Sequence, residues 1–402
     1  MNKIQLGVIF GSRSCEHEVS IISAVQLMRA VDLSKYDLIP IYISQNGVWY
    51  TGEPLKNIGT YTPFNENTKG ITQVQLDCVS GSGALLATKR TKGLFAKEEQ
   101  TVVARLDCVI PVMHGMHGED GTLQGMLEMC NLPYTSSGVG ACSMGMDKTY
   151  MKQYFIGCGF PVLPSTWVLR KTWQNDRESI VDKIEKTLEY PIFVKPASLG
   201  SSIGVTCAKS KDELIEAMDL AFEFDRKVLV EKGLTNMLEL NCSVLGYNDE
   251  VRASEIEMPL TEGDILDFTQ KYGNASTKGM ASLKRILPAP IEDSLKERMQ
   301  ELSIEIFKAM DCKGVVRIDF MYDSDSNNIY ITEINTIPGS LSFYLWEKSG
   351  LSYSMLIDEM VRFAMEAQQD KEDNNFAYHS DILKNIGLGG KTGTKHQGKV
   401  SV

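Results

Sequence analysis

A stretch near the C-terminal end of the sequence carries the residues best suited to chemistry. It reads VVRIDFMYDSDSNNIYITEINTIPG, from Val315 to Gly339. Two runs of branched and aromatic residues flank the turn formers at 323–328, which predicts an antiparallel β-hairpin. Because side chains alternate along a strand, Arg317 and Asp319 share one face of the first strand.

The second strand of this hairpin presents Glu333 and Asn335 on one of its faces. If that face coincides with the face of Arg317 and Asp319, two carboxylates, an amide and a guanidinium converge between apolar neighbours. Buried carboxylates are costly unless they are paired. Mg²⁺ binds oxygen ligands and usually keeps substrate phosphates in its shell, so a magnesium–phosphate site would explain the cluster. A solvated sheet face with one Arg–Asp pair is the alternative, and the spacing alone favours neither.

A second candidate for phosphate binding lies at 191–206, which reads PIFVKPASLGSSIGVT. The pattern is a strand that contains Lys195, a loop of small residues that includes Ser201 and Ser202, and another strand. Small side chains let backbone N–H groups approach a phosphate, and the lysine adds its charge. An ordinary glycine hairpin is the simpler interpretation of this loop when it is taken alone.

Two further segments could contact a nucleotide. The buried-strand pattern at 227–232 ends in Glu231 and Lys232, which could hydrogen-bond a base and a ribose or form a surface ion pair of little value. Residues 261–285 have no helix or strand period and contain several Lys and Arg residues. A long loop of this kind is usually functional or mobile, and we expect a lid that brings cations over an anion and excludes water.

Loops in the N-terminal part of the chain supply histidines and acids. The strand pattern at 4–10 is followed by a loop with Glu16, which could hold a substrate ammonium group or simply be solvated. The strand pattern at 106–113 ends in HGMHGEDGTLQG, which contains His114 and His117. A zinc pair is rejected because no third ligand stands at a suitable spacing. Open α/β sheets bind ligands at such glycine-rich loops, beyond the carboxyl ends of their strands.

Composition limits the classes of protein. The 402 residues suffice for two or three domains, and 43% hydrophobic and 23% charged residues are typical of a soluble globular protein. The net charge of −11 argues against nucleic acid or an anionic membrane as a partner. Nine cysteines without CxxC spacing, no signal peptide and no membrane-spanning run predict a cytoplasmic protein with reduced thiols.

Hydrophobic periodicity predicts the elements that position these residues. Residues 46–105 are expected to form hairpins and loops, and the first domain boundary is expected between Gly140 and Pro164. The tail at 385–402 is expected to be disordered, because its GLGGKTGTK lacks the strand and helix of a phosphate loop. Further strands are predicted at 37–44 and 239–245, and helices at 19–31, 143–157, 170–189, 211–223, 291–310 and 352–367.

Several of these stretches together resemble the D-alanine–D-alanine ligases, within the ATP-grasp superfamily. They follow the family's order and cover roughly the chain up to residue 365. Each is a weak signal alone, whereas the whole series in order is a strong one. The stretches are EHEVS (16–20), HGMHGEDGTLQG (114–125), MDK (146–148), VKPASLGSS (194–202), Glu231–Lys232, Lys271–Tyr272, RID (317–319) and EINTIPG (333–339).

The resemblance implies a mixed α/β, three-domain ATP-grasp architecture. An N-terminal, doubly wound α/β substrate domain would occupy 1–145, and a central ATP-grasp subdomain would occupy 146–232. A C-terminal subdomain at 233–370 would hold the metal site and the lid loop at 261–285. The tail at 371–402 lies outside the resemblance and is expected to be disordered.

The resemblance also implies a reaction. ATP would phosphorylate the carboxylate of one D-alanine, and the amine of a second D-amino acid would attack the acylphosphate. The products would be a dipeptide for peptidoglycan precursor synthesis, ADP and phosphate. ATP would lie between the central and C-terminal subdomains with two Mg²⁺ or Mn²⁺ ions, and the protein would be a homodimer with small-molecule substrates.

Site residues are carried over from the family only where this sequence matches its motifs. The residues around the first ammonium group would be Glu16, Ser201 and Tyr272, with His114 close to the first substrate. ATP would contact Lys148, Lys195, Ser202, Glu231, Lys232, Glu239 and Lys271. The metal ligands would be Asp319, Glu333 and Asn335. Arg317 and the Gly339 amide would stabilise the developing oxyanion, as such donors do in acyl transfer.

One departure from the family concerns the second substrate. After Gly339 the family commonly continues with a turn that contains a serine near this substrate, whereas here the sequence is SLSFYLW, with Tyr344 at about that position. The acceptor could therefore be D-alanine, D-serine, a D-hydroxy acid or another compound, although Lys271–Tyr272 favours dipeptide formation. A non-catalytic nucleotide-binding protein is disfavoured because the metal ligands and phosphate lysines are all present. The absence of HRD and DFG disfavours a protein kinase.

Overall fold

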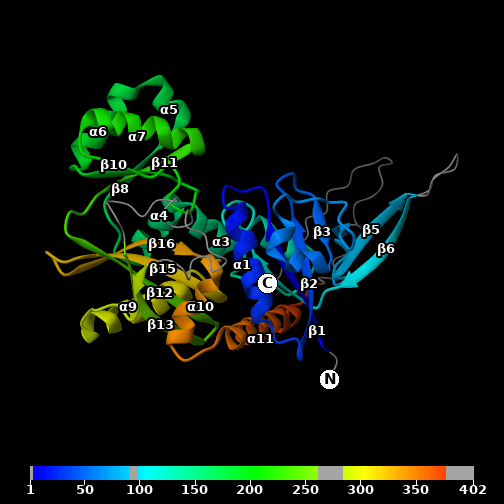
Figure 1. Cartoon of the computed structure of the whole chain (residues 1–402). Helices are drawn as coiled ribbons and strands as arrows, with labels where there is room; N and C mark the ends of the chain where they lie inside the picture. Colours follow the sequence, from blue (N-terminus) through cyan, green and yellow to red (C-terminus); the bar gives the residue numbers. More distant parts are fainter. Residues whose placement is uncertain (1–2, 91–97, 261–283, 377–402) are drawn as a thin grey trace, which may run out of the picture.

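Three β-sheets organise the computed structural model, which describes residues 3–90, 98–260 and 284–376. The sheet of β1–β7 stands beside the other two, which lie one above the other in Figure 1. The mixed α/β fold class is confirmed. Each sheet falls within one of the three predicted domain ranges, whose limits remain a prediction. The predicted lid lies outside the described residues except for Lys284 and Arg285. The predicted disordered tail lies outside them beyond residue 376, and its first residues, up to Glu372, belong to the last helix.

The first sheet has the strand order β6-β5-β4-β3-β2-β1-β7. Its parallel part is β1 (Ile4–Gly11) between β2 (Tyr36–Ile43) and β7 (Cys108–Val112). Helix α1 (His17–Ala30) packs with Phe10 on one face, and α2 (Thr122–Met129) packs with Ile9 on the other. The predicted hairpin region forms β3 (Trp49–Thr51), η1 (Glu53–Lys56), η2 (Ile58–Thr60), β4 (Thr72–Leu76), β5 (Ala84–Arg90) and β6 (Glu98–Arg105).

The second sheet is antiparallel, with the order β10-β9-β11-β8. Alternation along β9 sends Ile192 and Val194 into the core beneath the helices, and it sends Phe193 and Lys195 to the opposite face. The strands are β8 (Ser165–Leu169), β9 (Ile192–Pro196), β10 (Thr206–Ala208) and β11 (Lys227–Lys232). The helices are α5 (Arg170–Asn175), α6 (Arg177–Thr187) and α7 (Lys211–Phe224).

The third sheet has the order β14-β13-β12-β15-β16, and its polar face looks toward the second sheet. Ile318 and Phe320 point into the core under α9, so Arg317 and Asp319 occupy the opposite face. The predicted C-terminal hairpin is confirmed. The strands are β12 (Met237–Tyr247), β13 (Glu250–Pro259), β14 (Arg285–Ile286), β15 (Gly314–Asp323) and β16 (Asn328–Asn335). The helices are α3 (Val139–Met146), α4 (Lys148–Cys158), α9 (Asp293–Ala309) and α10 (Phe343–Lys348).

Two helix predictions are wrong in the same way. The segments 143–157 and 170–189 are each predicted as one helix, and each contains a break at an aspartate. Asp147 accepts bonds from the backbone N–H groups of Thr149 (3.0 Å) and Tyr150 (3.3 Å) and starts α4. Asp176 starts α6 in the same way. Aspartate competes for backbone donors and favours an N-cap over a helix interior, so hydrophobic period alone misses these breaks.

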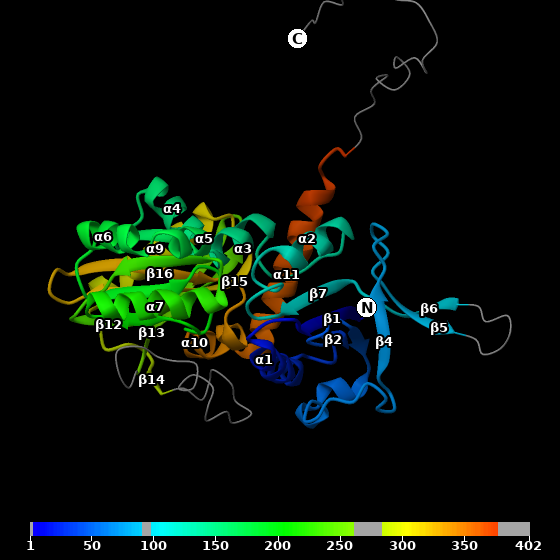
Figure 2. The same ribbon diagram turned by 90° about the horizontal axis from the view of Figure 1, so that it is seen from above.

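Helix α11 (Tyr353–Glu372) lies between the first and third sheets, as Figure 2 shows from above. The core beneath it contains Phe10 and Val112 of the first sheet together with Leu245 and Val315 of the third. The second sheet has a core of its own. Across the described part of the chain, none of the helices has the length and apolar composition of a membrane span.

Candidate active site

An open cavity lies between the polar faces of the second and third sheets. Loops of the first sheet close one end of it. Side chains from all three predicted domains line this cavity, so residues far apart in the sequence share one space. Those predicted from the sequence are Glu16, His114, Lys148, Lys195, Ser201, Ser202, Glu239, Arg317, Asp319, Glu333, Asn335 and Gly339.

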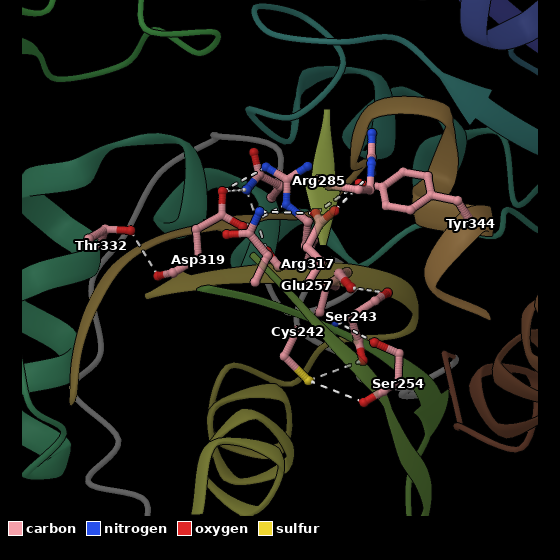
Figure 3. Close-up of polar contacts among 12 residues, drawn as sticks. Cys242, Ser243, Ser254, Glu257, Arg285, Arg317, Asp319, Thr332 and Tyr344 are labelled. Atoms are coloured by element: carbon pink, nitrogen blue, oxygen red, sulfur yellow. Dashed lines mark hydrogen bonds and ion pairs between the residues drawn. The ribbon is translucent and has the colours of Figure 1, made fainter. Parts of the chain in front are cut away.

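The floor of the cavity is the polar face of the β15–β16 hairpin. Asp319 pairs in register with Glu333, and Arg317 pairs with Asn335, so the predicted coincidence of the two faces is confirmed. Arg317 donates from Nε and Nη2 to the two oxygens of Asp319, each at 2.6 Å. The Arg–Asp pair of the alternative interpretation is therefore present as well, within a partly buried cluster (Figure 3).

The residue types of this cluster fit a hard divalent cation. Within residues 3–90, 98–260 and 284–376, no three His, Cys, Asp or Glu side chains gather as a complete metal site. Asp319, Glu333 and Asn335 offer two carboxylates and an amide, and Nδ2 of Asn335 lies 3.1 Å from Oδ2 of Asp319. Mg²⁺ usually takes one or two carboxylates and completes its shell with substrate phosphates and water. Lys148 Nζ, 3.3 Å from Glu333 Oε2, adds positive charge beside them.

Lys195 reaches the cavity from a buried ion cluster. Its Nζ pairs with Oε1 of Glu231, and Lys152 Nζ lies 2.7 Å from Oε2 of the same carboxylate. Glu231 and Lys152 are each 1% exposed in their side chains. Burial alone would raise the pKa of Glu231, but the two lysines lower it to about 2. Glu231 therefore stays ionised and holds Lys195 at the cavity wall.

Lys152→Met is expected to destabilise the protein by about 3 to 5 kcal/mol, because it leaves the Glu231 carboxylate buried with one cationic partner fewer. Urea unfolding measures the change. Lys211→Met is the matched control, since Lys211 forms an exposed pair with Asp182 at 3.4 Å and should cost at most about 1 kcal/mol. Equal effects of the two substitutions would contradict a shared buried cluster.

Glu16 lies where the first sheet meets the small-residue loop of the second. The Ser201 hydroxyl donates to Oε1 of Glu16. A Cβ added at Gly200 would lie 2.7 Å from Glu16 Oε2, and a Cβ at Gly115, whose φ is +72°, would lie 2.5 Å from the same oxygen. The two glycines therefore let backbone from both loops approach the carboxylate closely.

His114 and Glu119 connect the first domain to the segment that follows β16. His114 Nδ1 lies 3.0 Å from the carbonyl oxygen of Ile337, and its Nε2 lies 2.9 Å from the Ser23 hydroxyl. Glu119 accepts bonds from the N–H groups of Gly115 (2.8 Å) and Ile337 (3.1 Å). Burial lowers the pKa of His114 to about 4. Burial, and then the nearby Glu16 charge, raises the pKa of Glu119 well above its usual range.

The stability of the protein should depend on pH through His114. Its pKa is about 4 when folded and about 6.5 when unfolded, so the unfolded state binds the proton more tightly between these values. Stability should fall by about 3 kcal/mol from this residue as the pH drops through that window. Urea unfolding at several pH values should show this dependence weakened in His114→Gln.

The exposed His117 supplies the control for this measurement, since His117→Gln should keep the pH dependence of the parent protein. An unchanged dependence in His114→Gln would show that the buried imidazole is not its source.

The turn after Gly339 has an unusual backbone. Ser340, Leu341 and Ser342 have φ values of 50°, 52° and 51°, so three successive residues with side chains are left-handed. Each costs on the order of 1 to 2 kcal/mol, which surrounding packing must offset. All three are buried, and the Ser340 N–H donates to the Ser23 hydroxyl at 3.2 Å. The turn is thus locked to the first domain by the serine that also contacts His114.

Some predicted residues lie elsewhere. Glu231 stands behind Lys195, Lys232 pairs with Glu189 at 3.4 Å on the surface, and Tyr344 is buried behind the cavity wall. Their roles remain predictions, and Lys271 and Tyr272 lie outside the described residues.

Sequence reasoning missed other residues of the site. Asn241 and Glu257 line the cavity, and Lys152 supports it from behind. The acids noted in the HGMHGEDG loop were the one signal that could have identified Glu119.

Two antiparallel sheets that face each other across a polar cavity, beside a doubly wound α/β unit, place the chain in the ATP-grasp class of enzymes. Comparison with known proteins narrows the class. A family profile described as "D-ala D-ala ligase N-terminus" matches residues 5–137, and one described as "D-ala D-ala ligase C-terminus" matches residues 155–362. The chain therefore belongs to the D-alanine–D-alanine ligase family, as the sequence resemblance predicts.

Individual relatives agree with this assignment. The D-alanine–D-alanine ligase of Natranaerobius thermophilus is 38% identical over 379 residues, which are 93% of this chain and 98% of the relative. That of Thermosipho africanus is 38% identical over 380 residues, which are 94% and 98% of the two chains.

Solved structures agree as well. The D-alanine–D-alanine ligase of Coxiella burnetii has a TM-score of 0.75 at 26% identity and covers 92% of this chain and 97% of its own. The VanG D-Ala:D-Ser ligase of Enterococcus faecalis has a TM-score of 0.75 at 32% identity and covers 90% and 100%.

Proposed function

We propose that this protein joins two D-alanines through an acylphosphate at the expense of ATP and so supplies a peptidoglycan precursor. ATP first phosphorylates the carboxylate of the donor D-alanine. The amine of the acceptor then attacks the acyl carbon, phosphate leaves, and the dipeptide remains. The substrates are small molecules, and the homodimer and the cytoplasmic location remain predictions.

One observation supports this function above all. The hairpin carboxylates, with Lys148 and Lys195 beside them, line the same cavity as Glu16 and Ser201. The lysines can neutralise the phosphates of ATP by their charge, and the carboxylates can hold a metal ion that binds these phosphates. Glu16 lines the same cavity, and its carboxylate can bind the ammonium group of an amino acid. A cavity with both capacities suits the phosphorylation of an amino acid carboxylate.

Phosphoryl transfer depends on position and charge more than on covalent help from the protein. Asp319, Glu333 and Asn335 would hold Mg²⁺, and a metal bound there would supply positive charge to neutralise the phosphates of ATP. Lys195, fixed by Glu231, contributes a positive charge from the opposite wall, and Lys148 contributes another.

Attack on the acyl carbon places negative charge on its oxygen. Arg317 is held in one orientation by two bonds to Asp319, and the Gly339 N–H precedes the locked left-handed turn. Donors fixed in this way stabilise a developing oxyanion without reorganising, at about 3 kcal/mol each. Exclusion of water by the lid at 261–285 remains a prediction, because residues 261–283 lie outside the described part of the chain.

Asp319→Asn and Glu333→Gln are each expected to lower turnover at least about 100-fold, because each removes an anionic metal ligand and its electrostatic contribution. ADP release with D-alanine in saturating Mg²⁺ measures turnover, and thermal unfolding verifies the fold. Asp325→Asn, at the exposed tip of the same hairpin, is the control and should leave turnover unchanged. Near-normal rates in both site variants would contradict the metal site.

The acceptor is tested with ATP, Mg²⁺ and D-alanine alone, and then with added D-serine or D-lactate. We expect D-alanyl-D-alanine as the main product, identified by mass spectrometry. D-serine is the second candidate because of the structural likeness to a D-Ala:D-Ser ligase and because Tyr344 replaces the family's serine. Predominance of the mixed product would favour that candidate. Nucleotide binding without turnover for any acceptor would contradict the ligase function.

A further inference from the structure

A compact polar cluster lies beside the Arg317–Asp319 pair. Its centre is Glu257 on β13, a carboxylate that is almost fully buried. Glu257 accepts bonds from Arg285 Nη1 at 2.8 Å, from the Tyr344 hydroxyl at 3.0 Å and from Asn241 Nδ2 at 3.1 Å. Figure 3 shows Arg285 between Glu257 and the ring of Tyr344.

Arg285 is held on two sides. The carbon atom at the centre of its guanidinium lies 3.8 Å from the centroid of the Tyr344 ring, a cation–π contact, and Glu257 holds its Nη1. Its side chain is only 11% exposed, yet it lines the cavity. A guanidinium with this little freedom presents its charge to the cavity in a fixed orientation.

Tyr344 cannot take over the part of a small hydroxyl residue facing the acceptor. Its side chain is buried and does not line the cavity, and its single O–H donates to Glu257. The group that lines the cavity at this place is the guanidinium of Arg285, which is stacked on the Tyr344 ring.

We propose that Arg285 binds the carboxylate of the acceptor substrate, and that Tyr344 and Glu257 position it for that task. This inference rests on the proposed ligase function, which requires a second α-carboxylate in the cavity. An arginine pairs with a carboxylate through parallel N–H···O bonds, so it fixes the orientation of the acceptor as well as its place.

Four other described cations line the cavity, Lys284 among them, and three of these pair with carboxylates other than Glu257. Lys148 is paired with Glu333, Lys195 with Glu231, and Arg317 with Asp319. Arg285 borders Arg317 through the shared neighbours Glu257 and Tyr344. An acceptor whose carboxylate lies at Arg285 thus stands beside the group that faces the reacting acyl oxygen.

The proposal defines the acceptor by its free α-carboxylate and not by its side chain. D-alanine, D-serine and D-lactate all satisfy this requirement, whereas D-alaninamide does not. The experiment therefore supplies D-alanine and D-alaninamide together with ATP and Mg²⁺ and quantifies D-alanyl-D-alanine and D-alanyl-D-alaninamide by mass spectrometry. The change in their ratio between variants isolates the contribution of one side chain, because the intrinsic reactivity of the two amines is the same throughout.

Arg285→Met should lower kcat/KM for D-alanine as acceptor by about 10- to 100-fold, the range for a charged hydrogen bond. The same substitution should change kcat/KM for D-alaninamide little. The preference for D-alanine over D-alaninamide should therefore fall by the same factor of about 10- to 100-fold. The KM for ATP should stay near that of the parent protein. Arg252→Met is the matched control, since Arg252 lies on the neighbouring strand β13, is paired with Glu359 and does not line the cavity; its product ratio should be unchanged.

Two further variants keep the test valid if Arg285→Met does not fold. Arg285→Lys retains a charge without the planar fork and should lose part of the preference. Tyr344→Phe retains the ring beneath Arg285, and its preference should stay within about twofold of the parent value, because the hydroxyl donates to Glu257 and not to substrate. Loss of the preference in Tyr344→Phe would overturn the proposal by assigning the carboxylate to the hydroxyl.

The failure of this inference can be told from the failure of the proposed function. If the parent protein makes dipeptide and folded Arg285 variants keep its product ratio, Arg285 does not bind the acceptor carboxylate and the ligase function stands. If the parent protein makes neither product, the ligase function fails and the inference fails with it.

Discussion

The site depends on one buried carboxylate, Glu231, which two lysines share. A lysine at the wall of a cavity between two sheets loses much of its hydration, so it needs a fixed anion nearby to remain charged. Glu231 supplies that anion to Lys195, and Lys152 balances the remaining negative charge from below. The partners come from α4, β9 and β11, so this cluster ties the helix before the second sheet to two of its central strands.

Strand alternation does the rest of the positioning. In both sheets around the cavity, every second residue enters a core under helices, and the intervening residues face the partner sheet. Charged groups from strands that are distant in the sequence are thereby brought face to face. The apolar residues between them fix the register, because a slip by one residue would turn the whole polar set into the core.

Much of this organisation can be predicted from the sequence, for a physical reason. The period of two makes Asp319 and Glu333 neighbours as soon as the turn between their strands is recognised. The partnership of Lys152 with Glu231, and that of Glu257 with Arg285 and Tyr344, cannot be predicted in this way. They join separate elements, and nothing in the local pattern states which strands become neighbours. The helix breaks at Asp147 and Asp176 were missed because a single capping side chain outweighs a continuous apolar period.

The apolar core under α11 has a consequence for how the molecule comes apart. Side chains of the first and third sheets share that core, while the apolar core under the helices of the second sheet consists of residues of 168–230. Cooperative melting follows shared cores more closely than it follows chain order. We therefore expect two cooperative blocks, with the first and third sheets melting together and the second sheet forming the other. An intermediate in which only the second sheet is lost would keep Asp319 beside Glu333 and would leave Lys195 without its place in the cavity.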